Sequence, residues 1–330
     1  MWYTFVFSFL SMYSRYPWLS IKAKRAIFAL NNRIKLSMLP TRLALKIFES
    51  QISPILLYGA EVWAPYCNYQ FSNWEKSETE KTHTQYIKRI MGCDIHTPNL
   101  MIRGELGTRP LLCDVIKRSL SYIKHVDSNE NSLANIALDL EISLDDNMNI
   151  LAMVRNFTDY FAEKNNFLSP ATKSEIKKHV HDYYDLIWKE SINMLTKSDS
   201  YNSFKTMINL EKYTWAVKNV KHRIALSRLR LSCHQLMVEK GRHYRPTLPR
   251  PERKCPHCKN AVEDECNFIT SCPLYSTGRE ILYTEAKRNA TAFEEIPTDK
   301  QKFIFLLSNE NTKLLATFVH ESFNIRSSIN

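Results

Sequence analysis

The chain has 330 residues and a mass of 38.7 kDa, too long for one compact core of ordinary size, which predicts at least two packing units. Hydrophobic residues make up 44% and charged residues 24%, a globular balance that excludes a largely disordered chain. Only 6 residues are glycine, about 2% where roughly 7% is usual, which favours helices and argues against glycine-rich nucleotide-binding loops.

Positive charge is concentrated in one part of the chain. Lysine and arginine exceed aspartate and glutamate by 11 overall, and 13 of the 45 basic residues fall between Ser203 and Lys254, against three glutamates. A block of this density typically faces a polyanion, the alternative being a well-solvated helix surface. Residues 127–150 carry six acids and no lysine or arginine, which indicates a solvated linker.

The first 18 residues are mostly apolar, but they lack the signs of a targeting segment. No basic residue precedes the apolar stretch, and no small-residue cleavage site follows it before Arg15. The stretch is too short to span a bilayer, and no later run approaches 18 apolar residues, so no membrane partner is expected. We interpret it as a buried segment or as the artificial start of a gene model, with a secretory signal as the weaker alternative.

Helical periodicity runs through most of the chain. Residues 22–38 carry apolar positions at helical spacing, and Pro40 then opens a second helix. Residues 74–91 predict a polar helix that ends at Gly92. Further helices are expected at 149–165, 171–196, 279–289, 299–308 and 311–325. The predicted fold class is therefore mainly α, multi-helical, with a small zinc-knuckle subdomain near the C-terminus.

One helix is expected to run from Lys218 to Lys240, with Gly241 as its C-terminal cap. Its apolar seam consists of Val220, Ile224, Leu231 and Val238. A second stripe, roughly 80° away at 100° per residue, consists of Arg223, Arg230 and His234. The helix is thus predicted to bury one side and to present a line of cations on the other.

The stretch from Arg242 to Lys254 is basic and interrupted by prolines, with Tyr244 between two arginines. Such a strand can bind phosphates and stack a base, although an ordinary surface linker has the same composition. The candidate nucleic-acid-binding residues are Arg223, Arg228, Arg230, His234, Arg242, Tyr244, Arg245, Arg250, Arg253 and Lys254.

Four of the eight cysteines lie between Cys255 and Cys272. Cys255 and Cys258 have the C-x2-C spacing with which one turn presents two thiolates to a tetrahedral ion, and Cys266 and Cys272 could close the site. Zinc suits four sulfurs with no redox task, and four protein ligands would make it structural. The alternative is a set of unmetallated thiols. So few cysteines in a long chain indicate a reducing, intracellular compartment.

No catalytic residues are predicted. Asp145 and Asp146 could be taken for paired metal-binding carboxylates of a polymerase, but Ser143 stands two residues before them where an aromatic is expected, and no strand-forming runs flank them. A P-loop, a nucleophile elbow and an HExxH motif are also missing from the sequence.

Six strings in chain order carry a family resemblance. They are KAKRAIFALNNRIK, LPTRLALKIFESQISPILLYGAEVW, EKTHTQYIKRIMGCDIHTPNLMIRGELGTRPL, FKTMINLEKY, RIALSRLRLSCHQLMVEKGRHYRP and RKCPHCKNAVEDECNFITSCPLYSTGRE. Together, from about Lys22 to Arg326, they resemble the region downstream of the polymerase palm in reverse transcriptases of non-LTR (LINE-type) retrotransposons. The resemblance implies the thumb and connector of such an enzyme, followed by its C-terminal Cys/His knuckle beside a region that grips RNA or DNA.

Two departures from the family pattern shape the expected function. The family's Tyr/Phe-x-Asp-Asp palm lies upstream of the first matching string, where only about 20 residues stand here, so the chain is not expected to be an enzyme by itself. The family's third knuckle ligand is usually His, and that position is Asn267, with Cys266 just before it. The matching basic and neighbouring positions are Arg223, Arg228, Arg230, His234, Glu239, Gly241 and Arg242.

The resemblance therefore predicts a non-catalytic, nucleic-acid-binding fragment of a parent that performs RNA-templated DNA synthesis. Expected partners are RNA and/or DNA and a separate chain that supplies the palm, in the nucleus and/or cytoplasm. The alternatives are a zinc-stapled helical protein-interaction module and a non-functional relic of a decayed element. The expected divisions are a start segment (1–21), a thumb/connector-like region (22–126), an acidic linker (127–150), a basic helical region (151–250), the knuckle (251–285) and C-terminal helices (286–330).

Overall fold

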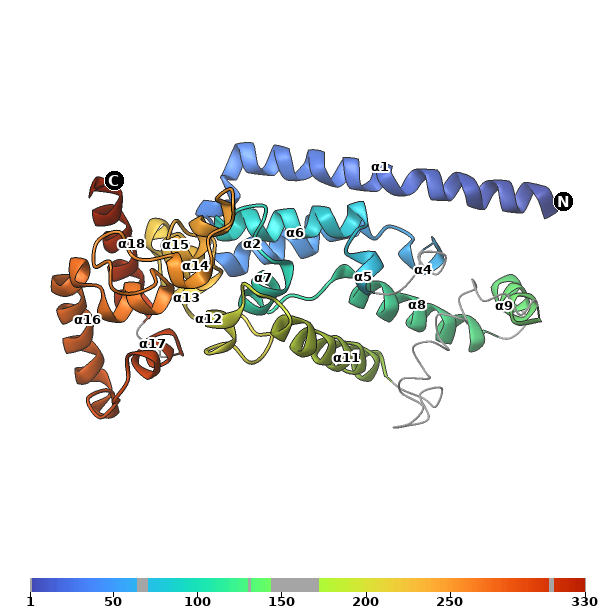
Figure 1. The fold of residues 1–330 in the computed structure, drawn as a ribbon. Coiled ribbons are helices and arrows are strands. Elements are labelled where there is room, and N and C mark those ends of the chain that lie inside the picture. The colour runs from blue at the N-terminus through green and yellow to red at the C-terminus, as the bar shows by residue number, and fades with distance from the viewer. Residues whose placement is uncertain (1, 64–70, 130–131, 144–171, 309–311, 330) are drawn as a thin grey trace. The chain divides into compact units, whose positions relative to one another are not determined.

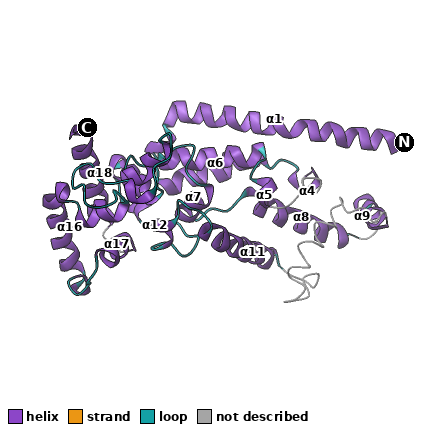
Figure 2. Ribbon diagram, in the orientation of Figure 1, coloured by secondary structure: helices purple, strands orange, loops and turns teal. Residues whose placement is uncertain are grey.

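The computed structural model describes residues 2–63, 71–129, 132–143, 172–308 and 312–329. Helices dominate them, and the described residues contain no strand longer than an isolated bridge, as Figure 2 shows. The mainly α fold class is thereby confirmed. Asp145, Asp146 and the helix expected at 149–165 lie outside the described residues.

The elements of the first part of the chain include two short helices of other types, the 3-10 helix η1 and the π-helix η2. Their bounds are α1 (Trp2–Ile34), η1 (Leu36–Met38), α2 (Thr41–Ile47), η2 (Phe48–Ile52), α3 (Ser53–Leu56), α4 (Ala60–Trp63), α5 (Phe71–Trp74), α6 (Glu78–Met91), α7 (Asn99–Leu106), α8 (Leu111–Asp127) and α9 (Leu133–Ser143).

The second part has longer helices at its two ends and short ones between them. The bounds are α11 (Lys173–Asn193), α12 (Asp199–Asn202), α13 (Tyr213–Ala216), α14 (Val220–Arg230), α15 (Met237–Lys240), η4 (Gly241–His243), η5 (Arg250–Glu252), η6 (Asn267–Ser271), η7 (Pro273–Tyr275), α16 (Ser276–Asn289), η8 (Thr291–Phe293), α17 (Asp299–Ser308) and α18 (Thr312–Ile329). The three closing helices expected from the periodicity are thus present as α16, α17 and α18.

The chain forms two compact units, each assembled from segments distant in sequence. One combines residues 1–33, 46–86 and 109–187, and the other combines 34–45, 87–108 and 188–330. None of the helices in the described part of the chain combines the length and the apolar character that a membrane crossing requires.

In the first unit, a buried carboxylate organises the start of α6. Glu80 accepts hydrogen bonds from the indole Nε1 of Trp74 and from the backbone N–H of Leu111, each at 2.8 Å, and its other oxygen lies 2.9 Å from Nδ1 of His83. The ring of His83 stacks on Phe48, with centroids 4.8 Å apart. A fully buried acid requires such partners, so polar side chains of α6 face the interior of this unit and not only the solvent.

In the second unit, α14 packs against α18 (Figure 1). Leu226 and Leu229 of α14 and Val319 of α18 are all buried. Asn219 is the N-cap of α14, and its side-chain oxygen accepts from the backbone N–H of Lys221 at 3.0 Å. The α14–α18 contact therefore supplies an apolar core within the unit that carries the clustered cysteines.

Two aromatic residues tie α7 into the same unit. The indole of Trp188 donates to the carbonyl of Leu100 at 2.8 Å, and the hydroxyl of Tyr201 donates to the carbonyl of Met101 at 2.9 Å. Both aromatic side chains are almost fully buried. Buried indole and phenol groups need such partners, so these bonds fix α7 within the unit.

The long helix expected from Lys218 to Lys240 is two helices. α14 ends at Arg230, Ser232 takes a left-handed conformation with φ 49°, and α15 starts only at Met237. Gly241 is not a left-handed cap, because its φ is −64°. It is small for another reason: a Cβ there would lie 2.7 Å from Cγ of Arg253.

Candidate functional site

Three cysteines converge in the second unit. The sulfur atoms of Cys255, Cys258 and Cys272 all lie within 4.8 Å of one another, and those of Cys255 and Cys272 are 3.8 Å apart. Among the residues that the structure describes, this is the group of side chains that could hold a metal ion. Three of the four cysteines that the sequence singled out are therefore brought together in a group that could hold a metal ion.

A tight hairpin positions the first two thiols. Lys254 and Val262 form an antiparallel bridge, and the backbone N–H of Cys255 donates to the carbonyl of Ala261 at 2.9 Å. Lys259, just after the second cysteine, has a φ of 58°, which turns the chain back. Because the whole turn spans only a few residues, the C-x2-C spacing is enough to specify it.

Backbone amides point at the sulfur atoms. The amides of His257 and Cys258 bond the Cys255 sulfur, and those of Asn260 and Ala261 bond the Cys258 sulfur. Burial still raises the pKa of Cys255 to about 12, whereas at Cys258 burial is outweighed by the amides, which lower its pKa. A cation among the three sulfurs would favour their thiolate forms, so metal binding should release protons.

Cys266 is a correction to the predicted ligand set. Its sulfur lies 3.7 Å from the hydroxyl of Thr270 and is outside the cluster. The next residue, Asn267, instead turns its side chain to Cys258. Consecutive helical residues differ by about 100° in direction, so only one of the two can face the thiols.

The fourth side of the cluster is polar and buried. Asn267 is 8% exposed, and its Oδ1 has no hydrogen-bond partner in the structure. Nε2 of His257, inside the first turn, is also buried without a partner. Three thiols beside an unpaired amide oxygen therefore fit a metal ion that has three sulfur ligands and a weaker fourth one.

Arg230 is buried, which corrects the predicted line of surface cations. It is 4% exposed, and its guanidinium forms two hydrogen bonds to the carboxylate of Glu105, at 2.8 and 2.9 Å. A third donor reaches the carbonyl of Leu307 at 2.7 Å, and the group lies over the ring of Phe204. Burial would lower the pKa of Arg230, but the Glu105 carboxylate outweighs it and raises that pKa.

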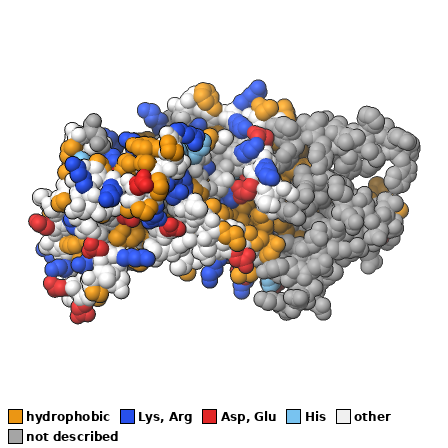
Figure 3. All heavy atoms as spheres, in the orientation of Figure 1, with side chains coloured by type: hydrophobic (Ala, Val, Ile, Leu, Met, Phe, Trp, Pro, Cys, Tyr) orange, Lys and Arg blue, Asp and Glu red, His pale blue; other side chains and the backbone are white. Residues whose placement is uncertain are grey.

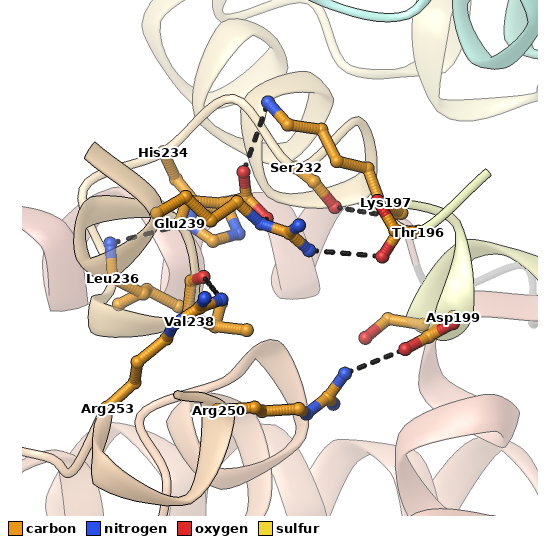
Figure 4. A network of polar contacts seen from close by, with 12 residues as sticks. Thr196, Lys197, Asp199, Ser232, His234, Leu236, Val238, Glu239, Arg250 and Arg253 are labelled. Carbon is orange, nitrogen blue, oxygen red and sulfur yellow. Dashed lines mark hydrogen bonds and ion pairs between the residues drawn. The ribbon is translucent and has the colours of Figure 1, made fainter. Parts of the chain in front are cut away.

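Three further predicted phosphate ligands are buried as well. Arg223 donates to the carbonyls of Ser37 and Leu39 at 3.1 and 3.0 Å. His234 lies 2.9 Å from the carboxylate of Glu265. Arg253 donates to the carbonyls of Leu248 and Val238 at 2.9 and 2.8 Å, and Figure 4 shows it directed at Val238. Each of these side chains is therefore paired with a partner inside the unit.

The remaining candidate residues are more exposed, but some of them are already bonded to other parts of the protein. Arg228 is exposed and donates to the carbonyl of Gly92 at 2.8 Å. Arg242 is half-buried and bonds Glu239 at 3.0 Å. Arg250 is exposed and pairs with Asp199 at 2.8 Å, as Figure 4 shows.

Tyr244, Arg245 and Lys254 are the candidates that remain open to a ligand. Tyr244 is 40% exposed, and both cations are exposed. Neither Arg245 nor Lys254 forms an ion pair with a residue that the structure describes. On the face drawn in Figure 3, cationic, acidic and hydrophobic side chains are mixed and do not separate into a purely cationic area.

Sequence reasoning missed the buried acids of the second unit. Glu263 forms two bonds with Arg326, at 2.8 and 2.9 Å, and both side chains are buried. Glu265 is also buried, while Asp264 between them is half-buried. The Glu-Asp-Glu segment gave no local signal of this burial, because the partners Arg326 and His234 are remote in sequence.

Compared with protein-family models, with curated proteins and with solved structures, the chain gives no match.

Proposed function

We propose that this chain is a zinc-stabilised helical segment that binds nucleic acid through an exposed basic loop. The loop, residues 242–254, begins shortly after α15 and ends directly before Cys255, the first cysteine of the cluster. The observation that carries the proposal is that Tyr244, Arg245 and Lys254 stay exposed in a loop whose other cations are held by the protein. Such a loop can contact phosphates and stack a base.

Zinc is proposed as the metal because the site consists of three cysteine sulfurs. Zinc is the usual ion of sulfur-rich sites that have no redox task. Cys255, Cys258 and Cys272 would bind it, with the fourth position on the side of Asn267. Its role would be structural: it would hold the hairpin against η6 and so fix where the basic loop ends. The resemblance to retrotransposon reverse transcriptases supports the same role, with RNA-templated DNA synthesis performed by a palm outside this chain.

Metal content tests the first half of the proposal. The purified chain should contain about one zinc per molecule by elemental analysis, and Cys272→Ser should lose it. Cys266→Ser is the matched control, because its sulfur lies outside the cluster, and it should keep the metal. Equal zinc loss in the two variants would contradict the ligand set.

Binding to labelled single-stranded RNA and DNA tests the second half. The affinity should fall as salt rises, and the variant R245A/K254A should reduce the slope of log K against log salt by roughly 1.4, since each single-strand phosphate contact contributes about 0.7. K287A/R288A removes two exposed cations of α16 and is the control. An affinity that is independent of salt would contradict the proposal.

A protein-interaction module is the second candidate. The burial of Arg223, Arg230, His234 and Arg253 favours it, because these side chains are held inside the protein and do not form a broad cationic surface. In that case R245A/K254A would leave a protein partner bound, and nucleic acid would bind weakly or not at all.

A further inference from the structure

Two cysteines outside the metal cluster each follow the end of a helix that terminates in the same way. Cys93 follows α6, and its N–H donates to the carbonyl of Lys88 at 3.0 Å. Cys233 follows α14, and its N–H donates to the carbonyl of Arg228 at 3.0 Å. In each case the residue before the cysteine is left-handed, Gly92 with φ 65° and Ser232 with φ 49°. Both thiols thus follow the same type of helix-ending turn, the Schellman motif.

The two helix ends are held together. Nε of Arg228 donates to the carbonyl of Gly92 at 2.8 Å. Gly92 also packs closely on Ile224, since a Cβ added to this glycine would lie 2.8 Å from Cγ2 of Ile224. The segments that carry the two thiols are therefore in direct contact although about 140 residues separate them in sequence.

The two thiols lie close enough to affect each other's pKa, and the Cys93 thiol donates to the carbonyl of Met91 at 3.7 Å. Both cysteines are free, and both residues are half-buried. The N–H of Asp94 and the hydroxyl of Thr97 also point at the Cys233 sulfur. The Thr97 side chain is buried, and its hydroxyl forms no regular hydrogen bond with the residues that the structure describes.

This environment gives the two thiols different pKa values. The neighbouring Cys93 thiol, with the Asp94 and Thr97 donors, outweighs burial and lowers the pKa of Cys233 to about 6. The neighbouring Cys233 sulfur and burial raise the pKa of Cys93 well above its usual value. A thiolate next to a protonated thiol is the arrangement of a nucleophile and a resolving thiol.

We propose that Cys93 and Cys233 are a reversible redox pair whose disulfide joins the ends of α6 and α14. With hydrogen peroxide as oxidant, the Cys233 thiolate attacks one peroxide oxygen, the O–O bond breaks, and a sulfenic acid and hydroxide form. The Cys93 thiol then attacks the Cys233 sulfur, the S–O bond breaks, and a disulfide forms. For hydrogen peroxide, two thiols and one peroxide yield one disulfide and two molecules of water.

The test uses the reduced full chain, with and without added zinc. After treatment with hydrogen peroxide and blocking with N-ethylmaleimide, peptide mass spectrometry should find Cys93 linked to Cys233, and dithiothreitol should reverse the link. The same linkage in the zinc-loaded chain would show that this pair is oxidised independently of the cysteines that bind the metal. Peroxide-treated protein in which both residues remain alkylatable, or in which they pair with other cysteines, overturns the proposal.

Variants distinguish the roles of the two thiols. Cys93→Ser should accumulate a sulfenic acid on Cys233 that dimedone traps, whereas Cys233→Ser should leave Cys93 unoxidised. Cys266→Ser is the matched control, since it is another half-buried cysteine of the same unit, and it should keep the linkage.

A measurement on the unmodified chain covers the case in which a variant fails to fold. Charged groups near the pair are Arg228 and Glu105 at Cys93, and His234 at Cys233. Alkylation of Cys233 should be half-maximal near pH 6, and Cys93 should react only at alkaline pH. Equal midpoints near pH 8.5, the usual thiol value, would overturn the proposal.

Discussion

The buried pair between Arg230 and Glu105 allows a sharp test of whether Arg230 is structural. Replacing Arg230 with Met keeps the apolar stem and removes the charge, which leaves the fully buried Glu105 without its bidentate partner. Breaking one side of a buried ion pair typically costs about 3 to 5 kcal/mol, because an uncompensated charge remains in the interior. The free energy of unfolding of this unit should fall by that amount.

Unfolding in urea, followed by tryptophan fluorescence, measures this loss. With a urea dependence of about 3 kcal/mol per molar, the midpoint should move down by roughly 1 to 2 M. Arg228→Met is the matched control on the same helix, because Arg228 is exposed, and its midpoint should move by much less. The double variant R230M/E105Q should recover part of the loss, since the buried charge is then removed from both sides.

One combination of stability and RNA affinity in R230M would refute the structural role of Arg230. If R230M unfolds at the same urea concentration as the unmodified chain but binds RNA more weakly, Arg230 acts at a surface and the burial argument fails. If R230M is destabilised while the remaining folded protein binds RNA with unchanged affinity, the cation is structural.

Three other outcomes follow from the structure. Gly104→Ala should destabilise the unit by about 1 to 3 kcal/mol, because the new Cβ would lie 2.5 Å from the hydroxyl of Tyr201, and the thermal midpoint measures the loss. Burial alone would raise the pKa of Glu265, but its bonds with His234 outweigh burial and lower that pKa to about 2. Its contribution to stability is therefore complete above about pH 4.5 and is lost as the pH falls toward 2, and Glu265→Gln should flatten that part of the pH profile. A zinc chelator should lower the thermal midpoint of the unmodified chain and of the Cys266→Ser control alike, and an unchanged midpoint would argue against a structural metal.

Features that depend on a few neighbouring residues could be predicted from the sequence. The C-x2-C turn, the end of α6 at Gly92 and the three closing helices depend on local spacing, turn chemistry and periodicity, and the structure contains each of them. Such signals lie within one or two helical turns of the residue concerned, so no distant partner is needed to interpret them.

The roles of the charged residues and of the cysteine neighbours were decided by tertiary structure. The helical pattern placed Arg230 on a polar stripe, but whether that stripe faces water or a buried carboxylate depends on Glu105, 125 residues away. The choice between Cys266 and Asn267 depends on the direction of η6, and the contact between Cys93 and Cys233 depends on two helix ends that meet only in the fold. Composition and periodicity indicate how polar a position is. Whether a polar side chain is buried, and what it pairs with, depends on segments that are remote in sequence. For this physical reason, only the tertiary structure could assign the roles of these residues.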